Sequence, residues 1–138
     1  MCILGIKEII EISKPRIVLL LVITAVTSMY AASKLIGPEL DTWGLIHIII
    51  AGGLASAGSS ALNHYYDRDI DPLMTRTSTR PIPSGRIKPN SVLIYGLTVS
   101  AISVVYGALA LNFVSAFFIA LGIFFYVIIY TVWLKRLN

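Results

Sequence analysis

One short stretch of the sequence carries the side chains that could hold a metal ion on a phosphate group. Asn63, Asp67 and Asp71 are each separated by four positions, and residues at this spacing project from the same face of an α-helix. The pattern predicts an amide and two carboxylates in one row. Carboxylates near a helix C-terminus oppose the macrodipole, which favours cations there. We therefore expect the row to bind a cation, and Mg²⁺ fits because it takes oxygen ligands from carboxylates and substrate phosphates.

The neighbouring Asp69 is a weaker metal candidate, because the helical period places it about 200° around the axis from Asp67. A simpler alternative is that these aspartates and the nearby arginines pair with each other at a membrane surface. We favour the metal site because three polar residues in helical register are followed at once by a basic loop rich in proline.

The basic residues of that loop are suited to an anionic ligand. Arginine makes planar, bidentate contacts with phosphate oxygens. Carboxylates for a metal beside arginines for phosphate indicate a metal–diphosphate ligand, and an apolar setting indicates that its other end is a hydrocarbon. The candidate diphosphate-binding residues are Arg76, Arg80, Arg68, Lys135 and Arg136. For the two residues of the tail, membrane anchoring explains the charge at least as well.

The elements that must position these residues are predicted to be membrane helices. Of the 138 residues, 57% are hydrophobic and 13% are charged, with a mean hydropathy of +0.82. Average soluble domains have about 45–50% apolar and about 25% charged residues. A spanning helix needs about 20 apolar residues, so the chain is expected to form an all-α transmembrane bundle of about four spans.

The predicted elements follow from the apolar runs and from the Pro and Gly residues between them. We expect a single domain over 1–138 that begins with an amphipathic, interfacial leader over 1–16. A polar loop rich in proline is expected over 72–90. The four spanning helices are predicted at about 17–36, 43–71, 91–111 and 113–134. The small residues over 51–61 favour close helix packing, with room for a bulky substrate as the alternative.

The distribution of charge orients the bundle. The net charge is +4, and the cations gather in the leader, in the 72–90 loop with the adjoining helix end, and in the tail. This pattern is typical of membrane orientation and argues against a nucleic-acid partner. It predicts that both termini and the loop lie on the cytoplasmic side of the lipid bilayer. The single cysteine, Cys2, excludes an internal disulfide, and the N-terminus lacks the pattern of a cleaved signal peptide.

The motif resembles the first aspartate-rich motif of the UbiA prenyltransferase superfamily. The string NHYYDRDIDPLMTRTSTRPIPSGRI over 63–87 is similar to the haem O synthase branch in particular. SKPRIV before the first predicted span and YTVWLKR after the fourth are similar to that branch as well. The resemblance covers nearly the whole chain, and residues 61–86 carry most of its specificity.

This resemblance implies a fold, a reaction and roles for individual residues. It implies a helical bundle whose central cavity opens toward lipid, in a bacterial plasma (inner) membrane or a mitochondrial inner membrane. Asn63, Asp67 and Asp71 would help to hold Mg²⁺ on farnesyl diphosphate, and Arg76 and Arg80 would contact the diphosphate. A vinyl group of haem b would then accept the farnesyl group to give haem O.

The chain also departs from the family pattern, which leaves alternatives open. Complete members continue into a second half with a further acidic loop, so we expect a truncated or split gene and a separate C-terminal half as a partner. The alternatives are an inactive remnant, a prenyltransferase for another aromatic acceptor, and a small transport or channel subunit. The last is disfavoured because ionisable residues are sparse between Ile17 and Leu62. His47 and His64 are interpreted as packed or interfacial histidines rather than haem ligands.

Overall fold

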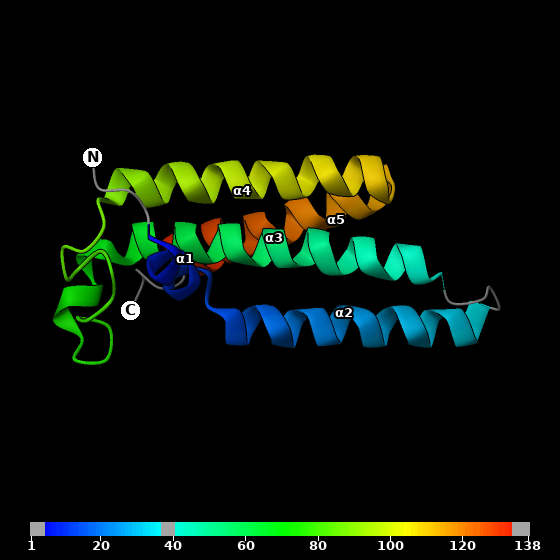
Figure 1. The fold of residues 1–138 in the computed structure, drawn as a ribbon, viewed down its shortest axis with the longest axis horizontal. Helices are drawn as coiled ribbons and strands as arrows, with labels where there is room; N and C mark the ends of the chain where they lie inside the picture. Colours follow the sequence, from blue (N-terminus) through cyan, green and yellow to red (C-terminus); the bar gives the residue numbers. More distant parts are fainter. Residues whose placement is uncertain (1–4, 37–40, 134–138) are drawn as a thin grey trace.

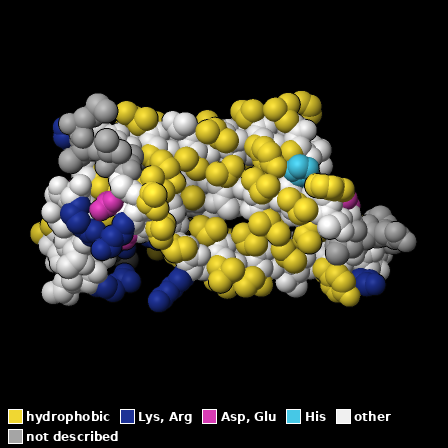
Figure 2. Space-filling view, viewed as in Figure 1, with side chains coloured by type: hydrophobic (Ala, Val, Ile, Leu, Met, Phe, Trp, Pro, Cys, Tyr) yellow, Lys and Arg dark blue, Asp and Glu magenta, His cyan; other side chains and the backbone are white. Residues whose placement is uncertain are grey.

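The protein is an all-helical membrane bundle in a computed structural model that describes residues 5–36 and 41–133. Every regular element among these residues is helical. Four helices are long and apolar enough to cross a membrane, namely Pro15–Ile36, Thr42–Asp69, Pro89–Ala110 and Phe113–Trp133. Figure 2 shows hydrophobic side chains over the middle of the bundle and charged side chains gathered toward its ends. The predicted fold class is confirmed, and the protein is an integral, multi-pass membrane protein.

Helix α3 is the central element. It spans Thr42–Tyr66 and packs most extensively against α4, which spans Pro89–Ala110. Helix α2, over Pro15–Ile36, lies along its other side, as Figure 1 shows. Helix α5, over Phe113–Phe124, contacts both α4 and α3. No side chain of α2 is fully buried, which suits a helix that faces lipid for most of its length.

Two helices begin at side chains that satisfy the first backbone N–H groups. The carboxylate of Asp41 accepts hydrogen bonds from the backbone N–H of Trp43 at 3.1 Å and of Gly44 at 3.0 Å. The amide oxygen of Asn112 accepts from the N–H of Ser115 at 2.7 Å and starts α5. Such caps stabilise a helix start by about 0.5–2 kcal/mol. The break between the spans predicted at about 91–111 and 113–134 is therefore present at Asn112, while most of the break predicted between 36 and 43 lies outside the described residues.

Small residues allow α3 and α4 to approach closely. A Cβ atom placed on Gly58 of α3 would lie 2.7 Å from the backbone nitrogen of Ser100, and one on Gly96 of α4 would lie 2.9 Å from the Leu62 side chain. Neither position has room for a larger residue without moving a helix. On this face of α3 the small residues serve helix packing, as the sequence favoured.

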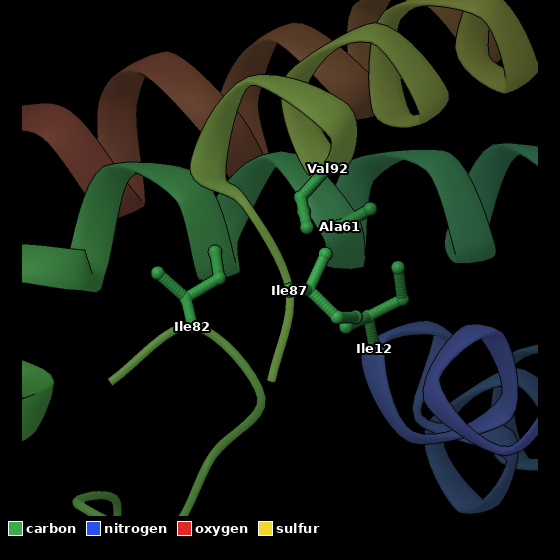
Figure 3. Close-up of a cluster of buried hydrophobic side chains, with 5 residues drawn as sticks. All are labelled: Ile12, Ala61, Ile82, Ile87 and Val92. Carbon is green, nitrogen blue, oxygen red and sulfur yellow. The ribbon is translucent and has the colours of Figure 1, made fainter. Parts of the chain in front are cut away.

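A hydrophobic cluster fastens the polar end of the bundle. Helix α1, over Ile6–Ser13, runs across the bundle and buries Ile12. Figure 3 shows Ile12 gathered with four side chains from α3, from the loop after it and from the start of α4, namely Ala61, Ile82, Ile87 and Val92. This cluster joins α1 to α3, to the loop and to the start of α4, so it fixes the loop against the end of α3.

An exposed ion pair adds a second connection between α1 and the loop. Arg86 donates to the two carboxylate oxygens of Glu11 at 2.8 and 3.0 Å. These hydrogen bonds raise the pKa of Arg86 above its ordinary value. Exposed pairs of this kind contribute little to stability, so the buried cluster carries most of the attachment.

The end of α3 differs from the prediction. We expected a continuous helix to about residue 71, but α-helical geometry ends at Tyr66 and two 3₁₀ turns follow, η1 over Asp67–Asp69 and η2 over Asp71–Leu73. Pro72 accounts for part of this, since proline disfavours α-helical geometry in the residue before it. Turns without longer helices then continue to Pro89, in agreement with the predicted loop.

The last span also changes geometry. After α5 the chain continues as a π-helix, η3, over Phe125–Trp133, where the prediction had a single helix over 113–134. Residue 134 lies outside the described residues. A π-helix has hydrogen bonds five residues apart and occurs frequently at functional sites. This segment returns beside α3, at the end of the bundle that carries the aspartate motif.

We predict that Gly58→Ala destabilises the protein by about 1–3 kcal/mol, because the added methyl group overpacks the contact with α4. The measurement is unfolding of the purified protein in detergent micelles. Gly52→Ala is the matched control on the same helix, since a Cβ there meets nothing within 4 Å. Equal stability of the two variants would contradict the close packing at Gly58.

Candidate metal and diphosphate site

The three residues of the predicted row are all buried. Asn63 is 3% exposed, and Asp67 and Asp71 are each 1% exposed. Removing a carboxylate from water is costly unless charged or hydrogen-bonding partners replace the lost solvation. The surroundings of each carboxylate therefore decide what the site can do.

The amide of Asn63 is at the centre of one hydrogen-bond network. Its Nδ2 donates to Oδ2 of Asp67 at 2.9 Å and to Oγ1 of Thr131 at 3.1 Å. Its Oδ1 accepts from Nζ of Lys14 at 2.8 Å. The direct contact between Asn63 and Asp67 agrees with the prediction that these two side chains share one helical face.

Asp71 belongs to a second group of contacts. Nη1 of Arg80 donates to both of its carboxylate oxygens, at 2.7 and 2.8 Å, and Arg80 is itself 21% exposed. The hydroxyl of Thr77 donates to the backbone carbonyl of Asp71 at 2.9 Å. Because α3 ends at Tyr66, Asp71 does not lie on the α-helical face that the spacing predicted. Its contacts come from Thr77 and Arg80 of the loop.

Of the other predicted basic residues, two lie within the described part of the chain, Arg68 and Arg76. The guanidinium of Arg68 lies 4.2 Å from the centroid of the Tyr65 ring and donates to the Tyr65 carbonyl at 3.0 Å. Arg76 is exposed on the loop. Lys135 and Arg136 lie outside the described residues. Of the five candidates, Arg80 is the one for which a contact with the aspartate row is seen in the described part of the chain.

The two histidines occupy different ends of α3. Nδ1 of His47 lies 2.7 Å from the hydroxyl of Tyr106 on α4, so it connects two helices, in line with its interpretation as a packed histidine. His64 is 3% exposed and follows Asn63 directly.

Thr131 is a site residue that was not predicted, and Lys14 was considered only as a cation that could anchor the membrane or contact an anion. Thr131 is buried in η3 and donates to the carbonyl of Tyr126 at 3.0 Å. Its contact with Asn63 joins residues 68 positions apart. A threonine within an apolar run carries no local signal for such a contact. For Lys14, the one local signal was its position directly before Pro15, at the start of α2.

An apolar groove begins beside this network. It has a volume of about 350 Å³ and lies between α2, α3 and the last span. Small residues of α3, among them Gly52, Ala55 and Ser59, form one wall, and Tyr126 lies at its edge. The phenol of Tyr126 is also within electrostatic reach of Asp67 and Arg80. The small residues over 51–61 thus pack closely against α4 on one face of α3 and line open space on another.

The donor set fits a cation that a ligand helps to coordinate. Among residues 5–36 and 41–133, no three His, Cys, Asp or Glu side chains converge into a metal cage. Two buried carboxylates with an arginine at hand resemble the usual Mg²⁺ arrangement, in which one or two carboxylates are completed by substrate phosphates. An amphiphile with a phosphate head and an apolar tail would match the network and the groove together.

The chain is similar to known proteins of one family. The model of the UbiA prenyltransferase family matches residues 20–138. Protoheme IX farnesyltransferase 1 of Cenarchaeum symbiosum is 66% identical over 137 residues, which cover 98% of this chain and 46% of the relative. Protoheme IX farnesyltransferase of Agrobacterium fabrum is 50% identical over 132 residues, covering 96% and 40%. The chain therefore spans less than half the length of these relatives. No solved structure matches the chain.

We predict that Arg80→Gln lowers the free energy of unfolding by about 1–3 kcal/mol, because Asp71 loses its charged partner while remaining buried. Arg76→Gln is the control, since it removes the same charge from an exposed position of the same loop. Thermal unfolding in micelles measures both. A loss no larger for Arg80→Gln than for Arg76→Gln would show that the pair does not compensate the buried carboxylate.

Proposed function

Because the chain belongs to the UbiA prenyltransferase family, we propose that it supplies the first aspartate-rich site of a protohaem IX farnesyltransferase. The reaction is transfer of the farnesyl group from farnesyl diphosphate to a vinyl group of haem b, giving haem O. The observation that carries this proposal is the burial of two carboxylates, Asp67 and Asp71, in a bundle that also holds an apolar groove with Tyr126 at its edge. The names of the relatives support the choice of acceptor and donor.

At the polar end, Asp67 and Asp71 would hold Mg²⁺ against the diphosphate. The ion would supply charge stabilisation for the leaving diphosphate. Arg80 bonds to Asp71 through one guanidinium nitrogen, so other donors of its fork remain to meet phosphate oxygens. Arg76, which is exposed on the same loop, would add a second positive charge to an incoming diphosphate.

At the apolar end, the groove would hold the farnesyl tail. Its volume of about 350 Å³ lies within the range of about 300–1,000 Å³ that small-molecule sites usually have. Breaking the bond between C1 of the farnesyl group and oxygen leaves the electron pair on the diphosphate. Apolar walls would keep water from the resulting allylic cation until the vinyl carbon of haem b attacks it. Water would then add to the new cation and lose a proton, which yields the hydroxyethylfarnesyl group.

The cations near the aspartate motif support a location of that motif at the inner face of the membrane. Because positive residues favour the inner side, this end and both termini would lie on the cytoplasmic or matrix side of an inner membrane. Since the relatives are more than twice as long as the matched region, a second half would complete the diphosphate site there. Whether that half is part of the same chain or separate does not change the roles of Asp67 and Asp71.

We expect Asp67→Asn and Asp71→Asn each to abolish Mg²⁺-dependent binding of farnesyl diphosphate, because each removes an anionic ligand of the cation. Asp69→Asn is the matched control from the same segment, since Asp69 is exposed. Binding is measured by titration of the chain in lipid nanodiscs, with and without Mg²⁺. Haem O formation from haem b and farnesyl diphosphate is the accompanying activity assay.

Retention of Mg²⁺-dependent binding in the Asp67→Asn and Asp71→Asn double variant, with the helical content intact, would overturn the proposed metal site. Loss of binding with a normal response in Asp69→Asn would support it. Haem O formation that disappears in both single variants and persists in the control would extend this support from binding to catalysis.

The groove gives a separate prediction about tail length. Gly122 lies on the groove wall, and a Cβ placed there meets nothing within 4 Å. Gly122→Leu should fill the groove and weaken binding of farnesyl diphosphate by roughly 10-fold or more, on the basis of about 0.8 kcal/mol per buried CH₂. Binding of dimethylallyl diphosphate, whose tail is one isoprene unit, should change little. Gly122→Ala serves as the graded control, and equal losses for both ligands would argue against tail binding here.

A further inference from the structure

The side-chain amide of Asn63 is held by partners from three separate segments. Lys14 comes from the junction between α1 and α2, Asp67 from the turn after α3, and Thr131 from η3. An ammonium group can only donate hydrogen bonds, and an ionised carboxylate can only accept them. Both therefore require the same orientation, with Oδ1 toward Lys14 and Nδ2 toward Asp67.

The opposite orientation of this amide would be unfavourable at two contacts at once. It would place the NH₂ group against the Lys14 ammonium and the carbonyl oxygen against the Asp67 carboxylate. Amide orientations are often assigned from the network alone, but here the fixed roles of two charged neighbours decide it. Asn63 itself is 3% exposed, so water offers no substitute partners.

Thr131 strengthens the same orientation. Its hydroxyl proton is directed to the carbonyl of Tyr126, five residues earlier, so its oxygen is left to accept from Nδ2 of Asn63. The spacing of five is that of a π-helix, and η3 is π-helical. The local geometry of the last span thus determines which way the Thr131 hydroxyl points.

The backbone around Lys14 explains how this side chain reaches the network. Lys14 has a φ of 49°, in the left-handed region that favours glycine, and Pro15 begins α2 directly after it. A non-glycine residue in this region is strained and persists only where the surrounding structure determines it. The hydrogen bond to Asn63 and the burial of the neighbouring Ile12 are two such determinants.

We propose that Lys14 and Thr131 are positioning residues that lock Asn63 as an N–H donor to Asp67. Asn63 then orients the carboxylate that receives the cation, and it does not offer its own oxygen to that cation. The lock is a property of the ligand-free protein. Its consequence for metal binding rests on the proposed function, so the two are tested by different measurements.

The first measurement needs no ligand. Selective ¹⁵N-asparagine labelling of the full chain in micelles reports the side-chain amides of Asn63, Asn90, Asn112 and Asn138, and Asn63→Gln identifies the Asn63 signal by its loss. We expect the Asn63 amide protons to exchange with water far more slowly than those of Asn90, which is exposed. Exchange should accelerate in Lys14→Met and in Thr131→Val, and Thr131→Ser should restore protection because it keeps the hydroxyl.

Matched controls separate this effect from general damage. Thr24→Val makes the same chemical change on α2, where the hydroxyl bonds only to the Leu20 carbonyl of its own helix among the contacts seen. Lys34→Met removes a lysine from the other end of α2. Neither control should alter exchange at Asn63. An Asn63 amide that exchanges as fast as Asn90 in the unaltered protein would overturn the lock.

The second measurement uses Mn²⁺ with farnesyl diphosphate as the probe, followed by electron paramagnetic resonance. Lys14→Met and Thr131→Val should weaken Mn²⁺ binding roughly 10–100-fold, the usual effect of removing a group that orients a metal ligand. Asn63→Asp discriminates further. A locked donor predicts weaker binding, because two carboxylates would then face each other, whereas an oxygen ligand predicts equal or tighter binding.

The outcomes keep the two proposals apart. A protected Asn63 amide together with no Mn²⁺ binding in the unaltered protein would support the lock and overturn the proposed function. Normal Mn²⁺ binding in Asn63→Asp would overturn the positioning role of Asn63 and leave the metal site standing. Weakened binding in Asn63→Asp and Lys14→Met, with Thr131→Ser close to the unaltered protein, would support the lock.

Discussion

The burial of two carboxylates at one end of a membrane bundle is the constraint on which the rest of this structure depends. Asp67 and Asp71 are almost inaccessible to water, and an uncompensated charge in such a position costs several kcal/mol. Two other segments of the chain therefore bring hydrogen-bond donors to this end. The α1–α2 junction brings Lys14, the loop brings Arg80, and both act on the carboxylate row directly or through Asn63.

Hydrophobic contacts hold in place the segments that carry these donors. Ile12, Ile82 and Ile87 pack with residues of α3 and α4, so α1 and the loop are fixed by dry contacts instead of by the polar groups themselves. Hydrophobic packing outside the membrane-spanning region thereby holds charged side chains in register. The rest of α3 divides its small residues between a tight contact with α4 and a groove beside the last span, which leaves space next to the charges without loosening the bundle.

Much of this could be predicted from the sequence, and the limits have physical causes. Apolar runs and their flanking residues define the four spans and the break between the last two at Asn112. The contact between Asn63 and Asp67 follows from helical spacing. The predicted end of α3 near residue 71 was wrong, since α-helical geometry ends at Tyr66. The 3₁₀ turns that follow depend on how the loop folds back against the bundle. The pairing of Asp71 with Arg80, nine residues apart, was open as an alternative because it depends on how the loop folds back. The contact of Thr131 with Asn63 joins residues 68 positions apart, and local patterns carry no information on such a contact.

The π-helical end of the last span has a consequence for how the chain can change in length. A π-helix contains more residues per turn than an α-helix, so η3 holds an extra residue relative to an α-helical path of the same extent. Deleting one of residues 127–130 would return a turn to α-helical geometry, and the residues after it would keep their direction, because the extra residue of a π turn is taken up within that turn. Thr131 would still face Asn63, and its hydroxyl would meet the Tyr126 carbonyl from four residues away instead of five. The π-helical geometry therefore allows the last span to differ in length by one residue without turning Thr131 away from the polar end of the bundle.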